Sequence, residues 1–252
     1  MAVAPGQAAQ TTVENTSTTP IDAQNPAKAE EGPAAVFLQK EAAQSFGDGA
    51  QRPTRWLTVS PYLEHEHLLD LYSVDIPNRL LALASTELEP ASPHYATIKY
   101  EEALDWDSLM FTLKSLAAKE GYKWTRREFY VVEFRSKLKK DIDVDLLFKL
   151  DKQSHIEATA SGGLLKYWYG VPDASRRNLA TCGPLPILPS GFYADTPAGL
   201  WRSKEDAVNG GRGPWHKQAR AAIPNMYEHI DVKGLRLVIE DDVRSWSFEP
   251  HA

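Results

Sequence analysis

Residues 128–240 carry an ordered series of apolar patterns, and that order restricts the fold more than any other feature of the sequence. Apolar residues alternate where strands are expected, and recur at spacings of three and four where helices are expected. The predicted strands are 128–138, 164–171, 177–182 and 234–240, and the predicted helical stretches are 143–160, 203–208 and 215–222. The order strand, helix, strand, strand, helix, strand is the ferredoxin-like split βαβ arrangement. The expected fold class is therefore α+β.

A sheet of this kind has helices on one face only, so its second face needs another cover. Phe129, Val131 and Trp168 make that second face apolar. We expect a second sheet to cover it in a homodimer of the dimeric α+β barrel type. Residues 56–127, read as an N-terminal elaboration, could instead cover the face within one chain.

The segment before residue 128 contains one clear helix, at 105–121. Apolar residues recur there at helical spacing, Asp105 can cap the first turn, and Gly121 can end the last. The apolar runs at 52–59 and 79–86 are expected to be strands or extended segments, and 245–248 an edge strand.

The first 53 residues differ in composition from the rest. They are dominated by Ala, Pro, Gln, Thr, Glu and Gly, with Phe37 and Phe46 as the only aromatic residues. Too little apolar area is available there to offset the entropy of ordering the chain. We therefore predict a disordered tail at 1–53 and a single domain at 54–252.

A proline-rich insert interrupts the third predicted strand at 183–199. It holds four prolines, each of which removes a backbone donor from a ladder. Joining its two flanks restores one strand that runs into a capped helix. The segment is either a natural surface loop or a translated intron, and peptides from it in a digest of cells would establish the loop.

Charge and cysteine content restrict the partners and the compartment. The formal net charge of -6 gives no electrostatic basis for binding nucleic acid or anionic lipid. The single cysteine, Cys182, cannot form an internal disulfide, and no secretory signal or membrane span is visible. We expect a cytoplasmic protein with no nucleic acid partner and no membrane association.

No motif in the sequence indicates a metal or a cofactor. His65-Glu66-His67 lacks the helical spacing and the third ligand of a zinc site, so an exposed polar patch is the expected reading. Asp141, Asp143 and Asp145 resemble the start of a calcium loop, but the glycine and the final acid are missing. No nicotinamide or flavin signature is present, and no cofactor is predicted.

The best candidate site combines two histidines with aromatic residues near the sheet and its helices. His216 follows a glycine-rich turn that opens a helix, where an imidazole can face a pocket and exchange a proton near neutral pH. His155 would be a second base, so His216 and His155 are the predicted catalytic residues. The predicted substrate-binding residues are Tyr167, Trp168, Tyr169, Trp201, Arg202 and Trp215. The alternative is that the aromatic residues simply fill the core.

Eight segments between residues 57 and 250 carry a family resemblance. They are HYATI (94–98), EFYVVEFRSKL (128–138), LDKQSHIEA (150–158), GGLLKYWYG (162–170), RNLATC (177–182), WRSKEDA (201–207), GPWHKQA (213–219) and LVIEDDVRSW (237–246). They resemble an uncharacterised fungal protein family in which the ATC segment runs straight into the WRS segment. Some members are associated with secondary-metabolite gene clusters, including clusters for oxopyrrolidines, which are polyketide and amino acid hybrids of tetramic acid type.

The resemblance implies an accessory role in secondary-metabolite biosynthesis. The order of elements also resembles the antibiotic-biosynthesis monooxygenases, which act on polyketide-like substrates without a bound metal or flavin. In one hypothesis the chain is a cofactor-independent monooxygenase-like or cyclase-like enzyme that holds an apolar intermediate. In the other it is a non-catalytic module that binds small molecules or partner proteins.

Overall fold

The computed structural model describes residues 55–181 and 199–251 of the chain. The tail predicted at 1–53 lies outside these residues, and so does the predicted insert except for Gly199. An antiparallel sheet occupies the centre. Its strands are β3 (Arg127–Leu138), β4 (Leu164–Lys166), β5 (Trp168–Tyr169), β6 (Arg177–Thr181), β7 (Gly199–Trp201), β8 (Tyr227–Ile239) and β9 (Trp246–Pro250).

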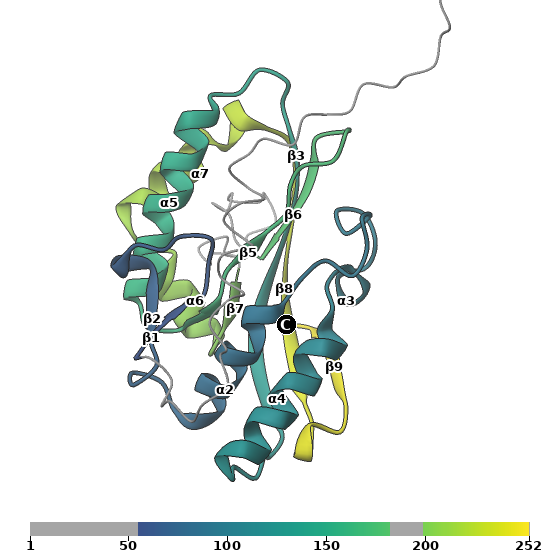
Figure 1. The fold of residues 1–252 in the computed structure, drawn as a ribbon. Coiled ribbons are helices and arrows are strands. Elements are labelled where there is room, and N and C mark those ends of the chain that lie inside the picture. The colour runs from purple at the N-terminus through teal and green to yellow at the C-terminus, as the bar shows by residue number, and fades with distance from the viewer. Residues whose placement is uncertain (1–54, 182–198, 252) are drawn as a thin grey trace, which may run out of the picture. The chain divides into compact units, whose positions relative to one another are not determined.

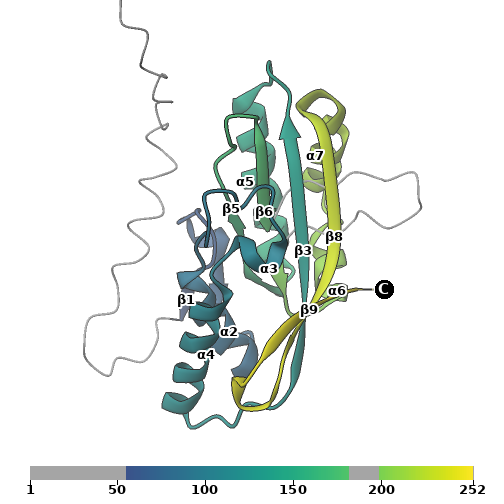
Figure 2. The ribbon, with the colours of Figure 1, turned by 90° about the vertical axis from the view of Figure 1, so that its right-hand side faces the viewer.

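Strand β3 is the axis of the sheet. Strand β8 pairs with it along its whole length, and β9 lies beyond β8 at the edge, as expected for 245–248. On the other side of β3 lie β6 and β7, followed by β5 and β4. Figure 2 shows β6, β3 and β8 side by side. The α+β class with an antiparallel sheet is thus confirmed.

Three helices, α5 (Val144–Ala160), α6 (Lys204–Gly210) and α7 (Pro214–Met226), pack on the face that carries Tyr130 and Val132. Asp143 caps α5 by accepting the backbone N–H of Leu146 at 2.8 Å. Ser203 caps α6 in the same way. Both helix starts were predicted. A short polar side chain stabilises such a start because it accepts a hydrogen bond from a backbone N–H that would otherwise be unpaired.

The N-terminal part of the described chain supplies the helices of the other face, while its turn at His65–His67 packs against α5. The elements of this part are β1 (Trp56–Thr58), η1 (His65–His67), β2 (Leu68–Asp70), α2 (Ile76–Ala84), η2 (Ser85–Glu87), α3 (Tyr100–Ala103) and α4 (Trp106–Glu120). A further 3₁₀ turn, η3 (Asp241–Val243), lies between β8 and β9. Asp105 caps α4 and Gly121 ends it with a left-handed φ of 67°, as predicted. No helix in 55–181 and 199–251 has the length and apolar character that a membrane span requires.

One continuous core joins this N-terminal part to the sheet. Leu81 of α2 and Leu109 of α4 belong to the same buried cluster as Val131 and Leu237. Figure 1 shows α3 and α4 on one side of the sheet and α5 and α7 on the other. The chain therefore covers its own second sheet face, which was the alternative to covering it with a partner subunit.

Two local predictions were wrong. The apolar run at 79–86 is not a strand, since its first residues belong to α2, where Pro77 sits in the first turn and Asp75 caps the helix. Proline is favoured at that position because its missing N–H would be unpaired there anyway. The single strand predicted at 164–171 is divided into β4 and β5, and Leu165 and Tyr167 pack on opposite sides of the sheet because the register shifts between Leu164 and Lys166.

Strands β6 and β7 pair with the same edge of β3, one after the other along its length. Ala180 lies opposite Phe134 and Gly199 lies opposite Val132, so Glu133 is the single β3 residue between these two positions. Thr181 is the single β6 residue beyond Ala180. The pairing thus continues as though Thr181 and Gly199 were neighbours in sequence.

We expect a variant that lacks residues 182–198 to fold into the same sheet and to be more stable. The register already matches across the junction, and closing a loop of this length costs about 2 kcal/mol of chain entropy. Urea unfolding of the deletion variant beside the full chain measures the gain. A variant that no longer unfolds cooperatively would show that the segment contributes to the fold.

Candidate functional site

The inward face of α5 carries polar groups where an ordinary core helix would carry apolar ones. Asp151 and His155 lie one helical turn apart on it, and His155 is fully buried. Tyr62 and Tyr167 both donate their phenolic O–H groups to the Asp151 carboxylate, Tyr167 at 2.6 Å. Burial raises the pKa of Asp151, and the two phenols oppose that shift.

Two buried histidines face each other beside this carboxylate. The Nδ1 atoms of His67 and His155 are 2.8 Å apart, so one ring must donate a proton that the other accepts. The Thr159 hydroxyl is 3.2 Å from the same nitrogen of His155. Burial lowers the pKa of both imidazoles, which favours the neutral pair. The neutral pair therefore shares one Nδ1 proton between its two rings.

Aromatic rings enclose the two histidines. The Tyr62 ring centroid lies 4.6 Å from that of His67, and the Tyr167 centroid lies 4.8 Å from that of His155. These rings come from three separate parts of the chain. Together with Asp151 they form a buried histidine–tyrosine–aspartate network.

A second acid–base pair connects α5 to α7. The Glu157 carboxylate accepts the backbone N–H groups of Trp215 at 2.7 Å and of His216 at 3.0 Å, and His216 Nδ1 lies 2.8 Å from it. It thereby caps the start of α7, where the N-cap, Gly213, has no side chain to do so. A Cβ on Gly213 would lie 2.1 Å from the carboxyl carbon, so this approach requires glycine.

The geometry of His216 fixes its tautomer. Because Nδ1 donates to a carboxylate, Nε2 is left with the lone pair, and that atom is buried with no hydrogen bond in the described part of the chain. Burial lowers the pKa of His216, while Glu157 acts in the opposite direction. A base oriented by a partly buried carboxylate is an arrangement suited to proton transfer.

The structure brings together part of the predicted site. His155, His216 and Tyr167 are each no more than 1% exposed, and Trp201 is fully buried in the core on the same side of the sheet. Tyr169 packs on Tyr167 with centroids 5.6 Å apart. Core packing accounts for most of these aromatic contacts.

Three predicted residues lie apart from this group. Trp168 points to the opposite sheet face and packs on Tyr95, because neighbouring strand residues alternate between faces. Trp215 is half-buried, with the Lys149 ammonium 5.8 Å from its ring. Arg202 forms two hydrogen bonds with Asp206 and lines a separate cavity of about 180 Å³.

The sequence reading missed four residues of the site. Tyr62, Asp151 and Glu157 were not singled out, although Asp151 stands one helical turn before His155 on a face that includes Leu150 and Ala158. The reading of His65-Glu66-His67 as an exposed patch was wrong for His67, which is fully buried within a 3₁₀ turn. Among the described residues no group of three or more His, Cys, Asp or Glu side chains could hold a metal ion.

Comparison with known proteins identifies the family. The family model described as PB2B2.08-like matches residues 58–183 and 196–250. The chain belongs to the PB2B2.08-like family. It is 32% identical over 203 residues to the UPF0643 protein PB2B2.08 of Schizosaccharomyces pombe, covering 78% of this chain and 84% of that protein. No solved structure matches.

The match to the PB2B2.08-like family bears on two earlier expectations. The uncharacterised fungal family is confirmed, whereas the link to secondary metabolism stays a prediction. The family match stops at 183 and resumes at 196, inside the predicted insert. This gap agrees with the continuous register of β6 and β7 beside β3.

Proposed function

We propose that this member of the PB2B2.08-like family is a cytoplasmic accessory protein of fungal secondary-metabolite biosynthesis. It acts on or binds an apolar intermediate of the oxopyrrolidine or tetramic acid type. The pathway assignment is supported by the sequence resemblance, and the proton chemistry is supported by the His216 geometry. No cofactor is part of the proposal.

We further propose that residues 127–239 are a ferredoxin-like split βαβ unit. The order β4/β5, β6/β7, β3, β8 across the sheet supports this assignment. The homodimer expected from the sequence was argued from an uncovered sheet face, and α2 and α4 cover that face. We therefore favour the single-chain form over the dimeric barrel.

One observation carries the chemistry: His216 Nδ1 is held 2.8 Å from the Glu157 carboxylate while Nε2 has no hydrogen bond in 55–181 and 199–251. In this role Nε2 removes a proton from the intermediate and returns it, and Glu157 stabilises the imidazolium that forms. His155 would serve as the second base. Tyr167, Tyr169 and Trp201 would supply apolar contact area.

The test is metabolite profiling of the producing fungus with this gene deleted and then complemented. We expect the wild type to restore a lost product and His216→Ala to leave one precursor accumulated. His229→Ala is the matched control, since His229 is exposed on β8 and should complement fully. A profile unchanged by the deletion, or full rescue by His216→Ala, would contradict the proposed role.

The second hypothesis, a non-catalytic binder, predicts a different result with purified protein. An enzyme converts the accumulated precursor, whereas a binder returns it unchanged. Incubating the precursor with wild-type protein and with His216→Ala therefore separates the two.

A further inference from the structure

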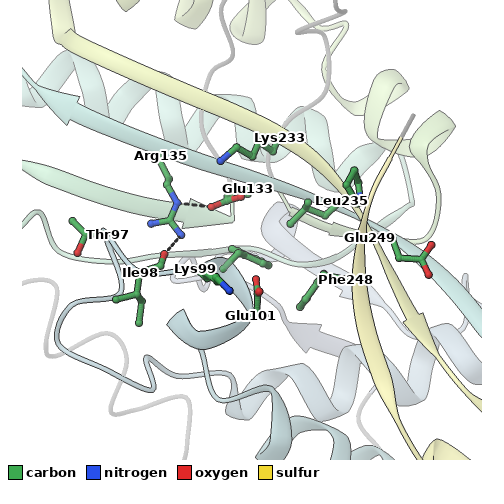
Figure 3. A pocket seen from close by; sticks show the side chains of 12 residues that line it. Thr97, Ile98, Lys99, Glu101, Glu133, Arg135, Lys233, Leu235, Phe248 and Glu249 are labelled. Carbon is green, nitrogen blue, oxygen red and sulfur yellow. Dashed lines mark hydrogen bonds and ion pairs between the residues drawn. The ribbon is translucent and has the colours of Figure 1, made fainter.

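An open cavity of about 480 Å³ lies on the sheet face opposite the histidine network. Residues 97–101, just before and within α3, form one wall, and β3, β8 and β9 form the rest (Figure 3). Its volume lies in the range of sites for small organic molecules. None of the predicted site residues lines it.

The floor of this cavity carries a buried ion pair. Glu133 of β3 is only 4% exposed, on a face where Phe129 and Val131 belong to the core. Its Oε1 accepts the Nε–H of Arg135, two residues along the strand and on the same face. Removing charged groups from water costs free energy even when they are paired. A buried ion pair beneath an open cavity is therefore a candidate functional site.

The remaining donors of Arg135 secure the cavity wall. Its guanidinium donates to the backbone carbonyl of Tyr95 at 3.2 Å and to that of Ile98 at 2.6 Å. These bonds hold the segment before α3 against β3. Arg135 is therefore largely committed to protein groups, and the wall is formed before any ligand arrives.

Glu133 keeps acceptor capacity that the protein does not use. Within the described ranges its Oε2 has no hydrogen bond, and the carboxylate lines the cavity. A carboxylate with one oxygen held by a guanidinium and the other facing a cavity can accept a hydrogen bond from a cationic donor. A primary ammonium group is the simplest ligand group with that property.

The rim supplies the other elements of recognition. Lys99 is exposed and has no ion pair in the described part of the chain, whereas Lys233 is paired with Asp231 at 2.9 Å. Leu235 and Phe248 form the apolar side (Figure 3). Cationic, anionic and apolar groups thus meet in one small space, which suits a zwitterion better than a simple anion.

We propose that this cavity binds a free α-amino acid with an apolar side chain. The ammonium group donates to Glu133, the carboxylate lies toward Lys99, and the side chain packs on Leu235 and Phe248. The inference is independent of the proposed role of His216, which lies on the other side of the sheet.

Isothermal titration calorimetry of the full chain with L-leucine and L-phenylalanine tests the proposal. N-acetyl-L-leucine lacks the ammonium, and leucinamide lacks the carboxylate. We expect either loss to weaken binding roughly ten- to hundredfold, as for a lost charge-assisted hydrogen bond. Glu133→Gln should weaken leucine binding to a similar extent, whereas Glu128→Gln, on the same strand outside the cavity, should not.

The Lys99→Ala variant separates weaker binding from a loss of folding. Lys99 is exposed and unpaired among the described residues, so this variant should keep its thermal stability and still bind leucine more weakly. Equal binding of leucine and N-acetyl-leucine would overturn the proposal. So would the absence of any binding heat with both amino acids at millimolar concentration.

Discussion

The free energy of unfolding should fall steeply as the pH drops from 7.5 to 5.5. His67, His155 and His216 are buried, and burial lowers the pKa of each in the folded state. The unfolded chain binds these protons near pH 6.5, so below that pH it holds more protons than the folded chain and is favoured. Each histidine contributes up to about 1.4 kcal/mol per pH unit, and we expect a total loss of about 2–4 kcal/mol at pH 5.5.

Urea unfolding followed by tryptophan fluorescence at several pH values measures this loss. His155→Gln should reduce the slope of stability against pH by roughly one proton. Asp151 acts in the opposite sense, since burial raises its pKa and the folded state then holds more protons. A flat profile between pH 7.5 and 5.5 would contradict the neutral buried histidines.

Glu157→Ala should lower the free energy of unfolding by about 3 kcal/mol, because removing one partner leaves buried polar groups unpaired. The variant leaves the Nδ1–H of His216 and two backbone N–H groups at the start of α7 without an acceptor. Thermal and urea unfolding measure the loss. Glu157→Gln should be milder, since an amide oxygen still accepts one of these bonds.

Glu205→Ala is the matched control for that substitution. Glu205 also stands near a helix start, in the first turn of α6, but it is exposed. Surface substitutions of this kind usually change stability by no more than about 0.5 kcal/mol. If Glu157→Ala stayed within the same limit, Glu157 would not be the group that holds His216 and α7.

Local patterns were sufficient where the signal lies within a few residues. Asp105 and Gly121 delimit α4 because a cap and a left-handed terminus act on their own helix. The run at 79–86 was misread because a short apolar stretch suits a strand or a buried helix equally well. The site was only half predicted: His216 was chosen because it follows a glycine-rich turn that opens a helix, and His155 as a second base, whereas Glu157 was not singled out.

Over residues 128–240 the sequence by itself determined the order of strands and helices, the capped helix starts and the interruption between β6 and β7, because each depends on neighbouring residues. Only the tertiary structure decided which distant groups meet. His67 and His155 are 88 residues apart in sequence, and Glu157 and His216 are 59 apart. Such pairs are created when η1 and α7 pack on α5, and no local spacing encodes that packing. The cover of the second sheet face likewise depends on how α2 and α4 dock, which alternation along β3 does not specify.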